Sequence, residues 1–175
     1  GFRPETTYVS LEIQDVAEFE CPLDMTQFSV IAPPVTEILA NDWLRQAMGA
    51  LARRNFQPYL PDTTQHKFLS SLRALQQIEH AEDFYVFLQN NDTGEMVGAI
   101  FEIPNFFEHW QGFPITQADV NSMVIDAQYR NQMAIYLLYS HLQQKLAARG
   151  IQREIGVAVW EKNLPAMRSF LKSAK

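Results

Sequence analysis

The chain has very little cysteine and no long hydrophobic run. Cys21 is the only cysteine among 175 residues, so no disulfide bond can form within the chain. This fits a reducing compartment, and a lone cysteine also serves simply as a small apolar side chain. No apolar stretch approaches the ~20 residues that span a bilayer, and no basic segment followed by an apolar one stands at the N-terminus. We therefore expect a soluble, cytoplasmic protein that does not bind membranes.

Positive charge is also scarce. The 14 Lys and Arg residues are outnumbered by 20 Asp and Glu residues, which gives a formal net charge of −6. Binding to a phosphate backbone would require a local basic patch that acts against this overall field. Nucleic acid is therefore not an expected partner.

The residue patterns of metal sites and of covalent catalysis are absent as well. His66, His80 and His141 have no metal-ligand spacing among themselves or with Cys21, so the sequence predicts no metal site. We find no Ser/His/Asp or Cys/His signature of a nucleophilic enzyme. These absences agree with chemistry that needs no covalent enzyme intermediate.

The size and the hydrophobic content of 47% fit one well-packed domain, residues 1–175. Near the N-terminus, "TYVSLEI" and "QFSVIAPP" predict one or two strands. Apolar residues from Val35 to Leu51 recur with the spacing of one helical face, which predicts a single helix with Arg53 and Arg54 at its C-terminal end. A second helix is predicted from Phe68 to Ile78 on the same grounds.

A β-hairpin is predicted after Asp83. "DFYVFLQ" and "EMVGAIFEI" have the composition of strands, and "NNDTG" between them is rich in residues that tolerate a tight reversal. The aromatic segment "NFFEHWQGFPITQAD" follows and is predicted to be a loop. It leads into the apolar strand "VNSMVI", which ends at Ile125.

The C-terminal third predicts the order strand, polar turn, helix, strand, helix. An apolar stripe at Ala134, Ile135, Leu138, Leu142 and Leu146 marks the first helix, and a glycine at position 150 is placed to end it. "IGVAVW" lacks alternation, which is typical of a strand covered on both faces. Asn163, followed by Pro165, is placed to start the final helix.

The segment from Val120 to Phe170 resembles the cofactor-binding half of the GNAT superfamily of acyl-CoA-dependent N-acyltransferases. In that family a strand leads into a turn of pattern Gln/Arg-x-x-Gly-x-Gly/Ala and a helix, and a second strand splayed from the first is followed by an Asn and a short helix. "MVIDAQYRNQMAIYLL", "GIQREIGVAVWEKN" and "NLPAMRSF" are similar to these parts in turn. The resemblance implies an α/β fold with a mixed, mainly antiparallel sheet flanked by helices and a splayed pair of parallel strands.

The resemblance also implies acetyl-CoA, or another acyl-CoA, as the donor. Backbone groups of Met123, Val124 and Ile125 would lie beside the pantetheine arm, and Asn163 would reach the cofactor from the second strand. Unsatisfied N–H groups and the helix dipole make a helix N-terminus an anion site. The predicted pyrophosphate contacts are Arg130, Asn131, Gln132, Met133, Ala134 and Ile135.

The sequence departs from the family pattern in the glycine-containing turn and at Phe170. With Tyr129-Arg130 as the entry, the glycine positions fall on Met133 and Ile135; with Gln128 they fall on Asn131 and Met133. Neither register supplies a glycine, although glycine is what allows a phosphate to approach such a backbone closely. Phe170 stands where many family members carry the Tyr that protonates the leaving thiolate.

Acyl transfer to an amine also needs a proton acceptor. Glu102, at the end of the hairpin's second strand, is the candidate base, and an outward-facing strand residue is the alternative. Glu108, His109 and Trp110 of the aromatic segment are candidate acceptor-binding residues. The aromatic rings of this segment either wall an acceptor or a long acyl chain, or plug the end of the core.

The resemblance does not account for the last part of the sheet. In the family one more strand or hairpin follows the helix that holds Phe170, whereas the sequence stops at Lys175. We expect either further residues or a homodimer to complete this edge. The expected function is transfer of an acyl group to a small-molecule or peptide amine; the alternatives are a non-catalytic GNAT-like interaction domain and an acyltransferase that uses a longer or carrier-bound donor.

Overall fold

The computed structural model describes residues 6–7, 10–12, 24–56, 67–132, 134–151, 153–155 and 159–160. Several features singled out in the sequence lie outside these ranges: Cys21, His66, Met133, Asn163, Phe170 and the predicted final helix. The expectations for them therefore stay predictions.

The described strands form a mixed sheet of six strands and a separate pair. The six-stranded sheet has the order β2-β7-β6-β5-β4-β3, and only its β6–β7 neighbours run parallel. This confirms the predicted mixed, mainly antiparallel sheet. The strands are β1 (Thr6–Thr7), β2 (Ser10–Glu12), β3 (Phe28–Ile31), β4 (Tyr85–Asn90), β5 (Met96–Pro104), β6 (Gln117–Ile125), β7 (Arg153–Ile155) and β8 (Val159–Trp160).

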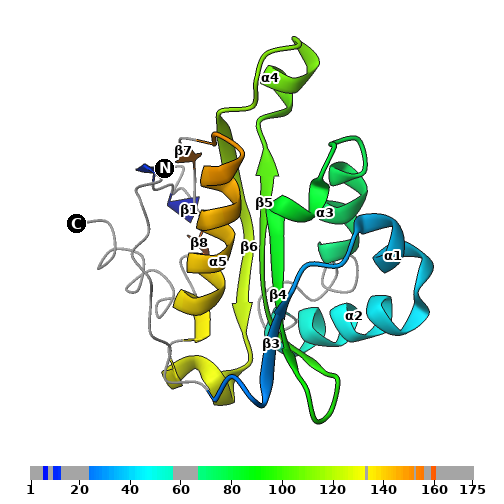
Figure 1. Ribbon diagram of the computed structural model, residues 1–175. Coiled ribbons are helices and arrows are strands. Elements are labelled where there is room, and N and C mark those ends of the chain that lie inside the picture. The colour runs from blue at the N-terminus through cyan, green and yellow to red at the C-terminus, as the bar shows by residue number, and fades with distance from the viewer. Residues whose placement is uncertain are drawn as a thin grey trace, which may run out of the picture.

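Helices cover both faces of the sheet (Figure 1). Helix α5 (Ala134–Ala148) packs on one face, and α1 (Val35–Ala40), α2 (Asp42–Phe56) and α3 (Lys67–Leu75) lie on the other. Short 3-10 turns, η2 (Ala81–Phe84) and η3 (Ala127–Gln132), precede β4 and α5. The small helix α4 (Phe106–Trp110) stands beyond the end of the sheet on the connection between β5 and β6.

The helix predicted from Val35 to Leu51 is in fact two helices. Asn41 has an extended backbone (φ −97°, ψ 110°) and separates α1 from α2. Its side-chain oxygen accepts hydrogen bonds from the N–H groups of Trp43 (2.9 Å) and Leu44 (3.2 Å). These bonds satisfy two N–H groups that a new helix leaves unpaired, so Asn41 acts as an N-cap and starts α2.

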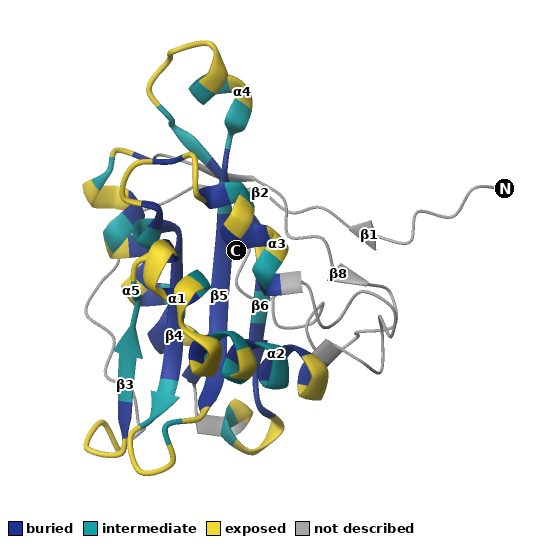
Figure 2. Cartoon of the chain, turned by 90° about the vertical axis from the view of Figure 1, so that its right-hand side faces the viewer, coloured by how far each residue is buried: buried dark blue, intermediate teal, exposed yellow. Residues whose placement is uncertain are grey.

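The predicted hairpin is present as β4 and β5. Gly94 has a φ of +72°, which permits the reversal that the "NNDTG" segment predicts. Strand β5 is buried along almost its whole length (Figure 2), because it lies at the centre of the sheet and has helices on both faces. Phe101 of β5 stacks on Phe68 of α3 with ring centroids 4.9 Å apart, so this side chain faces α3.

The opposite face of β5 packs on α5. A Cβ atom built on Gly98 would lie 3.1 Å from Leu138 Cδ1 and 2.4 Å from Ile125 Cδ1. Glycine is therefore required at this position by close packing, while its backbone is that of an ordinary strand residue.

The C-terminal elements are described only in part. Helix α5 begins at Ala134 and is followed by Gly150 at φ +81°, as its sequence predicts. Both ends of "IGVAVW", predicted as one strand, are extended: Ile155 ends β7 and Val159–Trp160 form β8, while residues 156–158 between them lie outside the described ranges. Both pair antiparallel with N-terminal segments: β2 pairs with β7, and β1 pairs with β8.

Candidate functional site

Among the described residues, the parallel strands β6 and β7 pair through two residues of each strand. The ladder joins Gln117 to Arg153 and Ala118 to Glu154. Ile155, the next residue of β7, pairs with Ser10 of β2 and has no partner on β6. Among the described residues, β6 from Asp119 onward therefore has no ladder with β7 on this side, as the splayed pair of the sequence interpretation requires.

A β-bulge lies in β6 where this ladder has ended. Ser122 is opposite Phe101 and Val120 is opposite Glu102, so Asn121 is an extra residue in β6. Its side-chain oxygen accepts hydrogen bonds from Ser71 Oγ of α3 (2.7 Å) and from Ser122 Oγ (3.1 Å). A bulge bends the strand that carries it, and the bond from α3 holds the bulged residue in position.

The three predicted pantetheine-flanking residues follow the bulge. The side chains of Val124 and Ile125 are each 5% exposed, and Met123 is partly buried against the core. Their side chains therefore belong to the core, and only their backbone groups are free to serve a ligand in the way the resemblance implies.

The turn after β6 is a 3-10 helix. Asp126 N–H donates to the carbonyl of Val97 (2.9 Å), and Tyr129 N–H donates to the carbonyl of Asp126 (2.9 Å). The Tyr129 ring packs edge-on against Phe28 with centroids 5.2 Å apart. These contacts attach the turn to both β5 and the edge strand β3.

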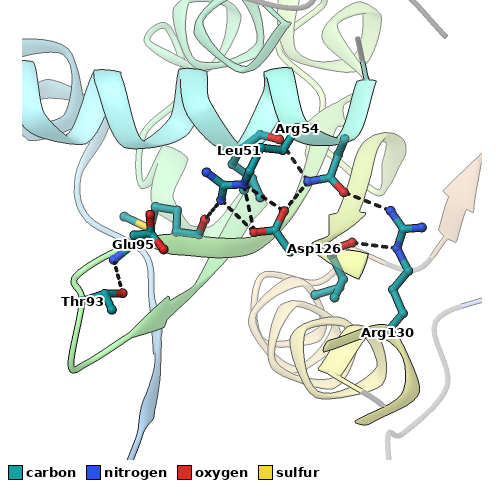
Figure 3. A network of polar contacts seen from close by, with 9 residues as sticks. Leu51, Arg54, Thr93, Glu95, Asp126 and Arg130 are labelled. Carbon is teal, nitrogen blue, oxygen red and sulfur yellow. Dashed lines mark hydrogen bonds and ion pairs between the residues drawn. The ribbon is translucent and has the colours of Figure 1, made fainter. Parts of the chain in front are cut away.

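A polar network anchors this turn to the C-terminal end of α2 (Figure 3). The Asp126 carboxylate, 11% exposed, accepts hydrogen bonds from Arg54 Nη2 (2.7 Å), Arg54 Nε (3.1 Å) and Asn55 Nδ2 (2.6 Å). Arg54 Nη2 also donates to the carbonyl of Met96 (2.8 Å). Because the buried carboxylate has a cation and an amide as partners, the cost of its desolvation is offset.

Arg130 belongs to the same network. Its Nε donates to the carbonyl of Ile125 (2.9 Å), and its Nη2 donates to Asn55 Oδ1 (3.1 Å). The residue remains exposed. The sequence analysis placed Arg130 beside a bound phosphate but did not identify Asp126 or Asn55. The available signal for Asp126 was a charged residue directly after an apolar strand.

The first turn of α5 is built from small and apolar residues. Ala134 is fully buried, and Ile135 is partly buried against the core. Asn131 and Gln132 lie within η3, and nothing is described of their side chains. The helix start therefore offers a ligand its backbone N–H groups, while the side chains of Ala134 and Ile135 serve packing.

Glu102 is a buried residue of β5, at the level of the bulge. It is 0% exposed and lies opposite Val120. The alternative interpretation as an outward-facing strand residue is therefore wrong. Alternation along β5 places its side chain on the face opposite to Phe101, which is the face covered by α5.

The aromatic segment forms an arm that projects from the sheet at α4 (Figure 1). Phe107, Trp110 and Phe113 are 66%, 70% and 63% exposed, so these rings do not plug the core. Phe106 alone among the four packs partly against it. Asn105 Oδ1 accepts from Phe107 N–H at 3.1 Å and caps α4.

Glu108 fixes the base of this arm, and His109 is half-buried beside it. The Glu108 carboxylate accepts hydrogen bonds from Thr116 N–H (2.8 Å) and Thr116 Oγ1 (2.7 Å). Partial burial acts to raise the pKa of Glu108, but the Thr116 and Gln117 hydrogen bonds outweigh it and the pKa lies below the usual value. Glu108 is therefore an ionised anchor of the arm and a poor proton acceptor near neutrality.

Neither a metal cluster nor a transmembrane helix is found in the described part of the chain. No group of three or more His, Cys, Asp or Glu side chains there is arranged to hold a metal ion. None of the helices described has the length and apolar character needed to cross a bilayer.

Solved structures with a similar fold are GNAT proteins. One is a GCN5-related N-acetyltransferase from Sphaerobacter thermophilus, with a TM-score of 0.62 and 13% identity over 93% of this chain and 46% of that one. Another is a tandem GNAT protein from the clavulanic acid biosynthesis pathway, with a TM-score of 0.60 and 15% identity over 97% of this chain and 48% of that one. At such identities the likeness shows the fold, and this chain spans about half the length of either structure.

Sequence comparison gives the family. None of the curated proteins searched matches the chain by sequence. The profile of the acetyltransferase (GNAT) family matches residues 45–174, which include most of α2, the bulged strand β6, the Asp126 network and α5. This match covers well over half of the sequence and agrees with the fold. The chain therefore belongs to the GNAT acetyltransferase family.

Proposed function

We propose that the protein transfers an acetyl or related acyl group from an acyl-CoA to an amine by direct attack. The observation that carries the proposal is the β6–β7 ladder, which among the described residues joins only Gln117 to Arg153 and Ala118 to Glu154, and which is followed in β6 by the Asn121 bulge and then by the start of α5. A parallel pair that separates leaves backbone donors and acceptors that need a partner. An extended amide-containing chain such as pantetheine supplies one.

The end of β6 offers positive charge to the negatively charged phosphates of the donor. The α5 N-terminus carries the positive end of a helix dipole, and Arg130 is exposed beside it. Arg130 is positioned by its bond to the carbonyl of Ile125, which leaves part of its guanidinium for a phosphate. In this proposal helix N–H groups and Arg130 bind the pyrophosphate in place of a glycine-rich loop.

The dimensions of β6 fit a donor bound along the strand. Val120 and Ile125 lie opposite Glu102 and Gly98, which are four residues apart on β5, so they are separated by about 13 Å at ~3.3 Å per strand residue. In this proposal the pyrophosphate lies at the turn and the reacting thioester near the bulge. Glu102 then takes the proton of the attacking amine, directly or through a water molecule.

The acceptor is assigned by class only. The arm of α4 offers Trp110 and His109 near the end of β5, and these residues contact the acceptor in our proposal. The amine attacks the thioester carbonyl carbon, the acyl group passes to nitrogen, and the CoA thiolate leaves and takes up a proton. No acyl-enzyme forms, so the chain needs no nucleophilic side chain.

Isothermal titration calorimetry with acetyl-CoA, octanoyl-CoA and free CoA tests the donor site. We expect saturable binding of at least one acyl-CoA. Tighter binding of octanoyl-CoA than of acetyl-CoA would identify a longer-chain donor. Absence of measurable heat with all three ligands at millimolar concentration would overturn the proposal in favour of a non-catalytic GNAT domain.

Thiol release in the presence of an amine panel tests the chemistry. Glu102→Gln keeps the shape of the side chain and removes its basicity, and it should lower kcat by about 10²-fold or more, the usual contribution of a positioned base. Its donor affinity by calorimetry should stay unchanged. Equal kcat values for Glu102→Gln and the parent protein would remove Glu102 from the reaction.

A further inference from the structure

A second concave site lies between α2 and the β4–β5 hairpin. It has a volume of about 300 Å³, and Trp43, Ala47, Ala50, Arg53 and Arg54 are among the α2 residues that line it. The hairpin contributes Thr93, Glu95 and Met96. None of these residues belongs to the proposed donor cleft between β6 and β7.

The hollow arises from small residues on one helical stripe. Trp43, Ala47, Ala50 and Arg54 follow one another at intervals of three or four residues, so they share a face of α2. The two alanines leave space where a larger side chain would reach the hairpin. Met96, 1% exposed, contributes an apolar wall.

A flat aromatic ring borders the same space. Trp43 is 48% exposed. Its ring packs closely over the hairpin turn, since a Cβ atom on Gly94 would lie 3.2 Å from Trp43 Cζ2. The ring is therefore held in place while nearly half of its surface stays open to a ligand.

Two arginines line the same pocket. Arg53 is exposed and forms no ion pair with any residue that the structure describes. Arg54 is paired through Nε and Nη2 with Asp126, while Nη1 has no partner within the described ranges. In Figure 3, Glu95 and Thr93 lie on one side of Arg54 and Asp126 on the other.

We propose that this pocket binds a small planar organic anion. The flat part of the ligand stacks on Trp43 above the Ala47 and Ala50 floor, and its carboxylate or phosphate binds Arg53 and the outer edge of Arg54. Guanidinium groups bind such anions through paired N–H donors. Glu95 opposes the ligand's charge and limits its affinity.

The inference does not rest on acyl transfer, because no lining residue is used in the proposed reaction. It has one connection with the donor site, through Arg54. The guanidinium that faces the pocket also holds Asp126 at the start of the turn that precedes α5.

Titration with benzoate, followed by the indole N–H signals in 1H–15N NMR spectra, tests the pocket. The chain has three Trp residues, and Trp43→Phe identifies the Trp43 signal. We expect benzoate to shift this signal saturably, and the neutral isostere benzamide to shift it much less. Ala50→Leu, which fills the pocket, should abolish the shift, whereas the matched substitution Ala147→Leu on exposed α5 surface should leave it unchanged.

Substitutions of charged residues in the pocket test whether electrostatic attraction contributes to benzoate binding. Arg53→Gln should weaken benzoate binding about two- to fivefold, the size of a solvent-exposed charge pair. Glu95→Gln should strengthen it by a similar factor. Equal binding of benzoate and benzamide, or an undiminished Trp43 shift in Ala50→Leu, would overturn the proposal, as would the absence of any saturable shift.

Discussion

Arg54 Nη2 lies 2.7 Å from Asp126 Oδ2, and this ion pair joins residues 72 positions apart in the chain. It connects the end of α2 to the turn between β6 and α5. Asn55 donates to the same carboxylate and accepts from Arg130, so one carboxylate fixes two elements around the proposed donor site.

Asp126→Ala should therefore destabilise the fold. The substitution leaves Arg54 without its counter-ion and the buried Asn55 amide without one of its two acceptors, which we expect to lower the free energy of unfolding by about 2 kcal/mol. Urea unfolding followed by circular dichroism measures this change.

The exposed pair of Asp42 and Arg45 provides the control. Asp42 is 81% exposed, so Asp42→Ala should change the free energy of unfolding by about 0.5 kcal/mol or less. Equal effects of the two substitutions would show that the Asp126 network contributes no more than a surface pair.

Gly98→Ala should be destabilising although glycine is replaced by a better strand residue. The new methyl group meets Ile125 Cδ1 at 2.4 Å, so the core must shift at a cost of about 1–3 kcal/mol. Ile125→Val removes that methyl group, and the double variant should therefore lose less stability than the sum of the single changes. Thermal unfolding of the four proteins measures the coupling.

A second glycine gives the opposite expectation. Gly49 lies within α2, and the nearest atom to a Cβ there is Arg53 Nη1 at 3.6 Å. Gly49→Ala should raise the free energy of unfolding by up to about 1 kcal/mol, because alanine favours the helix. A loss of stability at both positions would contradict the packing argument.

Arg130→Ala should weaken donor binding. If its exposed guanidinium binds a phosphate, the substitution should weaken acetyl-CoA binding by about 1–3 kcal/mol, as measured by calorimetry. Arg149→Ala, near the C-terminal end of α5, removes an arginine that pairs with Asp83 and should leave affinity unchanged. An unaltered affinity in Arg130→Ala would remove this residue from the donor site.

The stability of the protein should fall as the pH drops below about 6.5. Partial burial, and then the charge of Lys145, lower the pKa of His141 from its usual value of 6.5. Below pH 6.5 the unfolded chain therefore binds this proton more readily than the folded one, whereas above it both states are neutral. His141→Gln should flatten the decline in melting temperature between pH 7 and pH 5; an identical slope would exclude His141 as its cause.

Periodic patterns predicted most of the elements correctly because those elements bury one face or both. The hairpin, the strand that ends at Ile125 and helix α5 were found in this way. The break at Asn41 was missed because the apolar stripe continues across it, from Val35 and Ile38 to Leu44 and Met48, all of which are buried. Only the Asn-Asp dipeptide before Trp43 signalled a new N-cap.

The site was harder to predict than the fold because its contacts are non-local. Arg54 was interpreted as a cation at a helix end, whereas its partners are Asp126 and the carbonyl of Met96. The bulge at Asn121 depends on the register between β5 and β6, and two consecutive polar residues in an apolar strand were its only signal. Sequence periodicity contains no information on which distant side chains meet.

The pairing of β2 with β7 bears on the order in which the protein folds. Strands β3 to β6 lie within one continuous part of the chain, whereas Ser10 must find Ile155 across nearly its whole length. Contacts between such distant residues form late, because closing a long loop costs entropy before any contact repays it. The side of the sheet that borders β6 should therefore be assembled last, and pulsed hydrogen exchange during refolding should protect β4 and β5 before β7.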